Sequence, residues 1–79
     1  ANAKYDEAQK EYESILNAKG LKYFHPEASL KLGVTFEAKG DAAKAREAYE
    51  KTGREFPQSE AGKTAQQFMR LMEMKTSKG

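Results

Sequence analysis

The single histidine of the chain, His25, precedes Ser29 by four residues, which is about one turn of a helix. This spacing would let an imidazole accept the proton of a serine hydroxyl, as nucleophilic catalysis requires. A working site also needs a third group that orients the histidine and donors that stabilise an oxyanion. The sequence shows no motif for either, so we expect His25 to be an ordinary helix-start residue.

Four carboxylates near the N-terminus are the other candidates for acid or base chemistry: Asp6, Glu7, Glu11 and Glu13. On an open helix surface such residues usually form a solvated face. A zinc site would have to rely on carboxylates, because the chain has one histidine and no cysteine. There is also no glycine-rich phosphate loop. We therefore expect no enzyme, no metal site and no cofactor.

The composition indicates one small domain with a charged surface. Of the 79 residues, 38% are apolar and 33% are charged, and 14 basic side chains almost balance 12 acidic ones. The two signs are interleaved, whereas a nucleic-acid surface needs a clustered basic patch. No apolar run approaches the roughly 20 residues that span a bilayer. We therefore expect no nucleic-acid partner and no insertion into a membrane.

Residues 2–19 carry apolar residues at helical spacing. The stripe consists of Tyr5, Ala8, Tyr12, Ile15 and Leu16. Most other positions hold Ala, Glu, Gln or Lys, which are good helix formers. Gly20 follows as a natural C′ residue, the position where a left-handed backbone ends many helices. The segment is predicted to be a helix over residues 2–19.

Two further segments, 41–55 and 59–74, begin at residues that cap helices. Asp41 and Ser59 carry oxygens that can accept hydrogen bonds from the free N–H groups of a first turn. Apolar residues follow at spacings of three and four in both segments. Each segment is therefore predicted to be a helix.

The segment 28–38 alternates apolar and polar residues, which is the pattern of a half-buried strand. A lone strand without a partner would be unstable, however. Pro26 suits the first turn of a helix and Gly40 suits a C′ position. We therefore predict a helix over 26–39 with two apolar faces, and an all-α fold of four antiparallel helices. One face carries Ala28, Leu32 and Phe36, and the other carries Leu30, Val34 and Ala38.

The first and third predicted helices repeat each other at an offset of 37 residues, with Ala8 matching Ala45 and Tyr12 matching Tyr49. Two-helix repeats of this length are typical of solenoids, in which each unit buries its apolar face against the next. Residues 26–59 resemble one unit of the tetratricopeptide repeat (TPR) family. The positions that carry the resemblance are Leu32, Gly33, Phe36, Gly40, Asp41, Ala45, Tyr49 and Pro57.

The resemblance implies a right-handed TPR-like solenoid fragment that forms a single domain over residues 1–79. In it, 2–19 is the second helix of one unit, 26–59 is a full unit, and 60–74 is a capping helix or the first helix of the next unit. Gly33 would lie against Ala45, so that two helices approach closely while aromatic residues fill the space beside them.

Three features depart from the family pattern. Ser29 replaces a large residue, Thr52 replaces a small one, and the link from Leu16 to Pro26 is longer than in a standard array. The lengthened link, together with the proline, serine and alanine of the stretch EFPQSEAGKTA (residues 55–65), is similar to the TPRs of bacterial envelope proteins. Examples are the periplasmic coordinator associated with the Tol-Pal system and the outer-membrane assembly lipoproteins. This similarity favours the periplasm over the cytoplasm, and the lack of cysteine is compatible with both.

The resemblance also implies a module that binds another protein, since first helices of successive TPR units line a concave groove. The groove would hold a partner peptide or helix. It would be formed here by Glu27, Leu30, Val34, Glu37, Thr64, Phe68 and Leu71. Other TPRs clamp terminal carboxylates with Lys, Asn and Arg at groove positions, where this chain has Leu30, Val34 and Glu37. Carboxylate clamping is therefore not expected.

Alternatives to this assignment stay open. Leu30 and Val34 would equally serve as packing residues against a neighbouring helix of the fold. Leu71 and Met74 lie off the main stripe of the last helix, where they would be ordinary exposed residues or would dock a missing repeat or a second copy of the chain. The corresponding alternative functions are homo-oligomerisation through the apolar C-terminal helix, or a scaffold segment of a larger bacterial envelope protein.

Overall fold

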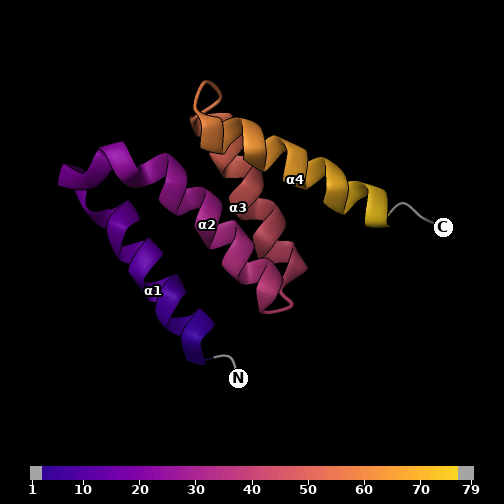
Figure 1. Ribbon diagram of the computed structural model, residues 1–79, viewed down its shortest axis with the longest axis horizontal. Helices are drawn as coiled ribbons and strands as arrows, with labels where there is room; N and C mark the ends of the chain where they lie inside the picture. The colour runs from indigo at the N-terminus through magenta and orange to yellow at the C-terminus, as the bar shows by residue number, and fades with distance from the viewer. Residues whose placement is uncertain (1–2, 77–79) are drawn as a thin grey trace.

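The structure, a computed structural model, describes residues 3–76 (Figure 1). Its elements are α1 (Ala3–Asn17), the 3₁₀-helix η1 (Lys19–Phe24), α2 (His25–Ala38), α3 (Ala42–Glu55) and α4 (Glu60–Thr76). No strand occurs within these residues, and the alternating segment 28–38 is helical, as predicted. None of the helices in this part of the chain has the length and apolar character needed to cross a membrane.

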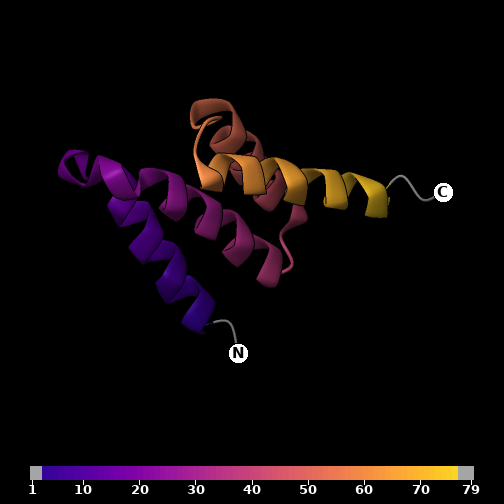
Figure 2. The same cartoon turned by 45° about the horizontal axis from the view of Figure 1, so that its top comes forward.

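The helices form a thin antiparallel row. Each α-helix packs against the next along the chain, and α4 also contacts α2 (Figures 1 and 2). Within the described residues, α1 packs only against α2 and η1. The Cα atoms extend over 44 × 34 × 14 Å, so most helices have a face with no helix against it. Few large side chains are therefore fully buried, and the largest of these are Tyr49 and Thr52.

The predicted N-caps of the last two helices are confirmed. The Asp41 Oδ1 atom accepts a hydrogen bond from the Lys44 N–H at 3.2 Å. The Ser59 hydroxyl oxygen accepts from the Gly62 N–H at 2.9 Å. These bonds satisfy backbone donors that have no partner within a first helical turn. Pro26 lies in the first turn of α2, as its missing N–H group and fixed φ favour.

The first helix ends earlier than predicted. It stops at Asn17, and η1 fills most of the lengthened link. Gly20 lies inside η1, whereas Gly40, with φ 87°, has the left-handed backbone of a C′ residue. The C′ prediction is thus right for Gly40 and wrong for Gly20. The link turns through short-range hydrogen bonds instead, such as that from the Leu21 N–H to the Ala18 carbonyl at 3.0 Å.

The core lies where α2 crosses α3, and it depends on a missing side chain. A β-carbon on Gly33 would lie 2.6 Å from Cε1 of Tyr49, so only glycine lets the tyrosine ring rest on α2. The predicted close approach of the two helices is confirmed, but its contact differs. The three atoms nearest to that β-carbon belong to Tyr49 and Ala48, and none of them belongs to Ala45. The buried core residues are Phe36, Ala45, Tyr49, Ala65 and Met72.

The two departures from the family pattern, Ser29 and Thr52, face each other in this core. Both side chains are buried, and their hydroxyl groups form a hydrogen bond between α2 and α3. The Thr52 hydroxyl donates its one hydrogen to the Ala48 carbonyl at 2.6 Å. The Ser29 hydroxyl must therefore be the donor to Thr52. Each departure thus supplies a polar partner that the other needs.

We expect Gly33→Ala to lower the free energy of unfolding, although alanine is the better helix former by about 1 kcal/mol. The added carbon would overlap the ring of Tyr49, which is 0% exposed and packed against the Phe68 ring. Overpacking of this kind costs about 1–3 kcal/mol, so after the gain in helix propensity a net loss of up to about 2 kcal/mol should appear in chemical denaturation. Gly20→Ala is the matched control, because nothing lies within 4 Å of its β-carbon. Equal stability of the two variants would contradict the packing described.

We expect Thr52→Val to destabilise the protein more than Ser29→Ala. Valine would leave the buried Ser29 hydroxyl without its acceptor, at a cost of about 1–3 kcal/mol. Ser29→Ala would leave Thr52 its bond to the Ala48 carbonyl. The double variant should regain part of the loss, because replacing both partners by apolar groups is nearly neutral. Denaturation midpoints measure this coupling, and strictly additive losses would argue against it.

A candidate partner-binding groove

A groove of about 360 Å³ lies between α2 and α4, with α3 beneath it. Val34 and Glu37 come from α2, Phe68, Leu71 and Lys75 come from α4, and Tyr49 comes from α3. Most of this lining is apolar, and its charged groups are one carboxylate and one ammonium. The groove can therefore bind apolar side chains of another molecule, and it has one negative and one positive group that could bind neighbouring charged side chains.

Tyr49 forms the rigid floor of the groove. Its ring meets the Phe68 ring edge to face, with centroids 5.5 Å apart and planes at 70°. Its hydroxyl donates a hydrogen bond to Oε1 of Glu37 at 2.7 Å. Burial first, and then the bond and charge of Glu37, raise the pKa of Tyr49. The tyrosine therefore stays neutral and remains a donor that holds the Glu37 carboxylate in place.

Four of the seven predicted groove residues line this groove: Val34, Glu37, Phe68 and Leu71. The other three lie elsewhere. Leu30 is half-buried and packs against the core, and Thr64 is half-buried on α4. Glu27 is exposed, with its carboxylate 3.9 Å from the Lys31 ammonium. Packing within the fold and lining of the groove were the two alternatives for Leu30 and Val34. Each holds for one of them, since Leu30 packs against the core and Val34, 40% exposed, lines the groove.

Glu27 belongs to a second hollow, of about 690 Å³, between η1 and the start of α4. Aromatic residues of the lengthened link line it together with Phe56. Tyr23 and Phe24 meet edge to face at 5.3 Å and are 89% and 51% exposed. This aromatic surface was not among the sequence-based predictions, because the link was treated only as a connection.

His25 and Ser29 do not pair with each other. The Nε2 atom of His25 lies 3.1 Å from the Ala18 carbonyl, so Nε2 carries the hydrogen and donates it to the backbone. The Ser29 hydroxyl is bonded to Thr52 and is 5% exposed. Both side chains therefore hold elements together. Within residues 3–76, no group of three or more His, Asp or Glu side chains is placed to hold a metal ion.

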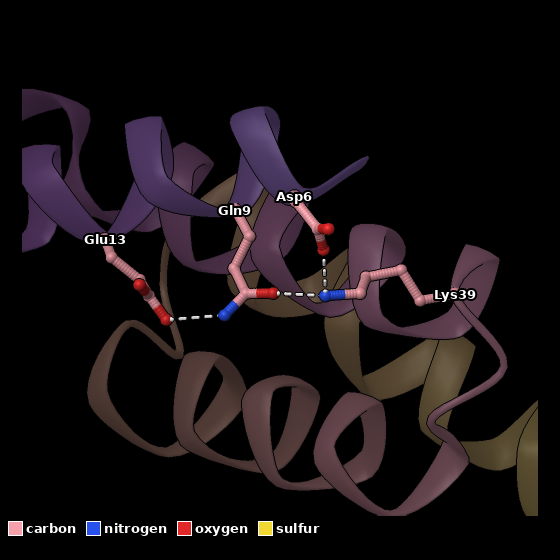
Figure 3. A network of polar contacts seen from close by, with 4 residues as sticks. All are labelled: Asp6, Gln9, Glu13 and Lys39. Carbon is pink, nitrogen blue, oxygen red and sulfur yellow. Dashed lines mark hydrogen bonds and ion pairs between the residues drawn. The ribbon is translucent and has the colours of Figure 1, made fainter. Parts of the chain in front are cut away.

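The N-terminal carboxylates take part in a contact between α1 and α2 (Figure 3). The Lys39 ammonium lies 2.6 Å from Oδ1 of Asp6 and 2.7 Å from Oε1 of Gln9. Gln9 in turn donates to Oε2 of Glu13 at 3.1 Å. The bond and charge of Lys39 lower the pKa of Asp6. These groups attach α1 to the C-terminal end of α2, while Glu7 and Glu11 are exposed, as expected for a solvated face.

Two groove residues were missing from the predicted site. Tyr49 is among the positions that carry the TPR resemblance, and in the structure it belongs to the core and forms the floor of the groove. Lys75 follows Leu71 by four residues and Phe68 by seven, so it continues the same helical stripe. That spacing could have identified Lys75 as a groove residue, whereas nothing in the local sequence indicates that a core tyrosine faces the groove.

Above pH 10 we expect wild-type protein to lose stability more steeply than Tyr49→Phe. The raised pKa of Tyr49 means that its contribution is full below the ordinary tyrosine pKa of about 10. It is lost as pH rises further, because the unfolded chain releases the proton first. The excess slope should reach up to about 1.4 kcal/mol per pH unit. Tyr23→Phe, at a residue 89% exposed, should follow wild type in the same denaturation series. Parallel curves for wild type and Tyr49→Phe would contradict the buried hydroxyl.

Comparison with known proteins gives one family match. Residues 27–59 match the family model described as tetratricopeptide repeat. No curated protein and no solved structure matches the chain. The matched segment contains most of α2, all of α3 and the turn that precedes α4. The match supports the resemblance of the helix pair that carries Gly33 and Tyr49 to a tetratricopeptide repeat unit.

Proposed function

We propose that the chain is a non-catalytic protein–protein interaction module that holds a partner peptide or helix in the groove between α2 and α4. TPR repeats generally mediate protein–protein interaction. The observation that carries the proposal is the floor of the groove. Tyr49 is fully buried beneath the groove, where it bonds to Glu37 and packs against Phe68, so these two lining residues have a fixed support before a partner arrives. Binding to a preformed surface avoids much of the entropy cost of ordering side chains.

The same proposal treats residues 1–79 as one TPR-like domain. Here α1 is the second helix of one unit, residues 26–59 form a complete unit, and α4 is a cap or the first helix of the next. With α2 and α4 as successive first helices, the groove between them is the concave side. Assignment to the bacterial cell envelope is a separate part of the proposal, supported by the lengthened link and by the stretch EFPQSEAGKTA (residues 55–65). Recovery of the chain in the cytoplasmic fraction alone would contradict that part.

Self-association is the second candidate function, and the exposed apolar residues of α4 favour it. Leu71 is 53% exposed and Met74 is 69% exposed. Two apolar side chains on one helix would lose this contact with water if a second copy of the chain packed against them. Leu71 also lines the groove, whereas Met74 lies outside that lining, so Met74 is the side chain that distinguishes the two functions.

Val34→Asp tests the proposed groove. Because Val34 is 40% exposed, an acid there should leave the fold intact while placing a charge inside an apolar lining. The tagged wild-type chain is used to capture proteins from a lysate of its source organism. We expect the amount of these proteins captured by the variant to be about tenfold lower in quantitative mass spectrometry. Met74→Asp is the matched control and should retain them.

Two outcomes would overturn the groove as the binding surface. The first is undiminished capture of the same proteins by Val34→Asp. The second is loss of capture with Met74→Asp, accompanied by concentration-dependent dimerisation of wild type in sedimentation. That second result would favour self-association through α4.

A further inference from the structure

We propose that the groove selects partner segments in which a basic residue adjoins a large apolar one. This inference rests on the proposed function of the groove as a protein-binding surface. It adds the chemistry of the partner, which the family match does not supply. Residues of the groove lining around Tyr49 provide the charge and the apolar surface that would select such a partner.

Glu37 is a fixed acceptor at the edge of the groove. Its Oε1 atom accepts the Tyr49 hydroxyl at 2.7 Å, and Tyr49 itself is held by the core. A carboxylate has about four acceptor positions, so this one bond leaves capacity for further donors. A guanidinium or ammonium group of a partner would form a charge-assisted bond to a group that is already oriented. Less side-chain entropy is then lost on binding than with a free surface carboxylate.

Apolar surface lies directly beside this carboxylate. Val34 is one turn before Glu37 on α2, and Leu71 faces the same groove from α4. They are 40% and 53% exposed, and the Phe68 ring, which meets the Tyr49 ring edge to face, belongs to the same lining. A leucine, isoleucine or phenylalanine of the partner would cover these side chains. Its neighbouring basic residue would then reach Glu37.

The other charges around the groove do not cancel this preference. Lys75 lies on the α4 side, in the last turn of its helix, where the carbonyl dipoles attract its cation. It is a mobile point charge on a four-carbon stem, whereas Glu37 is held by a hydrogen bond. Glu27, the other acid predicted for this face, lies outside the groove lining beside Lys31. The fixed charge of the groove is therefore negative.

Three acetylated and amidated pentapeptides test the inference by ¹⁵N–¹H NMR titration of the protein. Their sequences are Gly-Arg-Leu-Arg-Gly, Gly-Glu-Leu-Glu-Gly and Gly-Arg-Ala-Arg-Gly. We expect shifts at the amides of Val34, Glu37 and Leu71. The arginine–leucine peptide should bind about three- to tenfold more tightly than either of the others at low ionic strength. The preference over the glutamate peptide should shrink as salt is added.

Variants assign the preference to one side chain. Glu37→Gln removes the charge but keeps an oxygen that can accept the Tyr49 hydroxyl, so we expect it to bind the arginine and glutamate peptides alike. Glu27→Gln, an exposed residue of the same helix, is the matched control and should keep the wild-type preference. The amide spectrum of each variant also shows whether the variant is folded, so a loss of binding can be distinguished from a loss of structure.

Several results would overturn the inference. Equal affinity of wild type for the arginine–leucine and glutamate–leucine peptides would remove the charge selection and leave the groove function standing. Equal affinity for the leucine and alanine peptides would remove the apolar part. The absence of groove shifts with all three peptides would remove both parts. The groove function would then be judged separately by capture with the Val34→Asp variant.

Discussion

The structure depends on the position where α2 has no side chain and α3 has its largest buried one. A β-carbon at Gly33 would lie 2.6 Å from the Tyr49 ring, so the two helices can pack this closely only with glycine there. Once seated, the ring reaches Phe68 on α4, and its hydroxyl reaches Glu37 on α2. One tyrosine therefore joins three helices, and the contact that stabilises the core also builds the floor of the groove.

Much of this arrangement follows from local sequence rules. The N-caps Asp41 and Ser59 and the left-handed Gly40 were predictable because each satisfies a backbone requirement within a few residues. The two-faced helix over 28–38 was predictable because a strand there would have no partner. The same helix left one question that periodicity does not answer. Whether Leu30 and Val34, which share the second apolar face, meet the core or the groove depends on where α4 lies.

The features that escaped prediction are those set by contacts distant in sequence. Ser29 and Thr52 each depart from the family pattern, and only their meeting across α2 and α3 explains both. Gly62 is a further case, because a β-carbon there would lie 1.8 Å from the Phe56 carbonyl oxygen, and the path of the loop before α4 determines that contact. The link before α2 also folded into η1 and exposed aromatic side chains, where the local sequence indicated only extra length.

The contact between Gly33 and the Tyr49 ring can be measured directly by nuclear Overhauser effects in solution. The structure predicts strong cross-peaks between the α-protons of Gly33 and the ring protons of Tyr49. It also predicts cross-peaks between the rings of Tyr49 and Phe68. If a folded, helical sample gave no cross-peak between Gly33 and Tyr49, both the packing of α2 on α3 and the groove built on it would be contradicted.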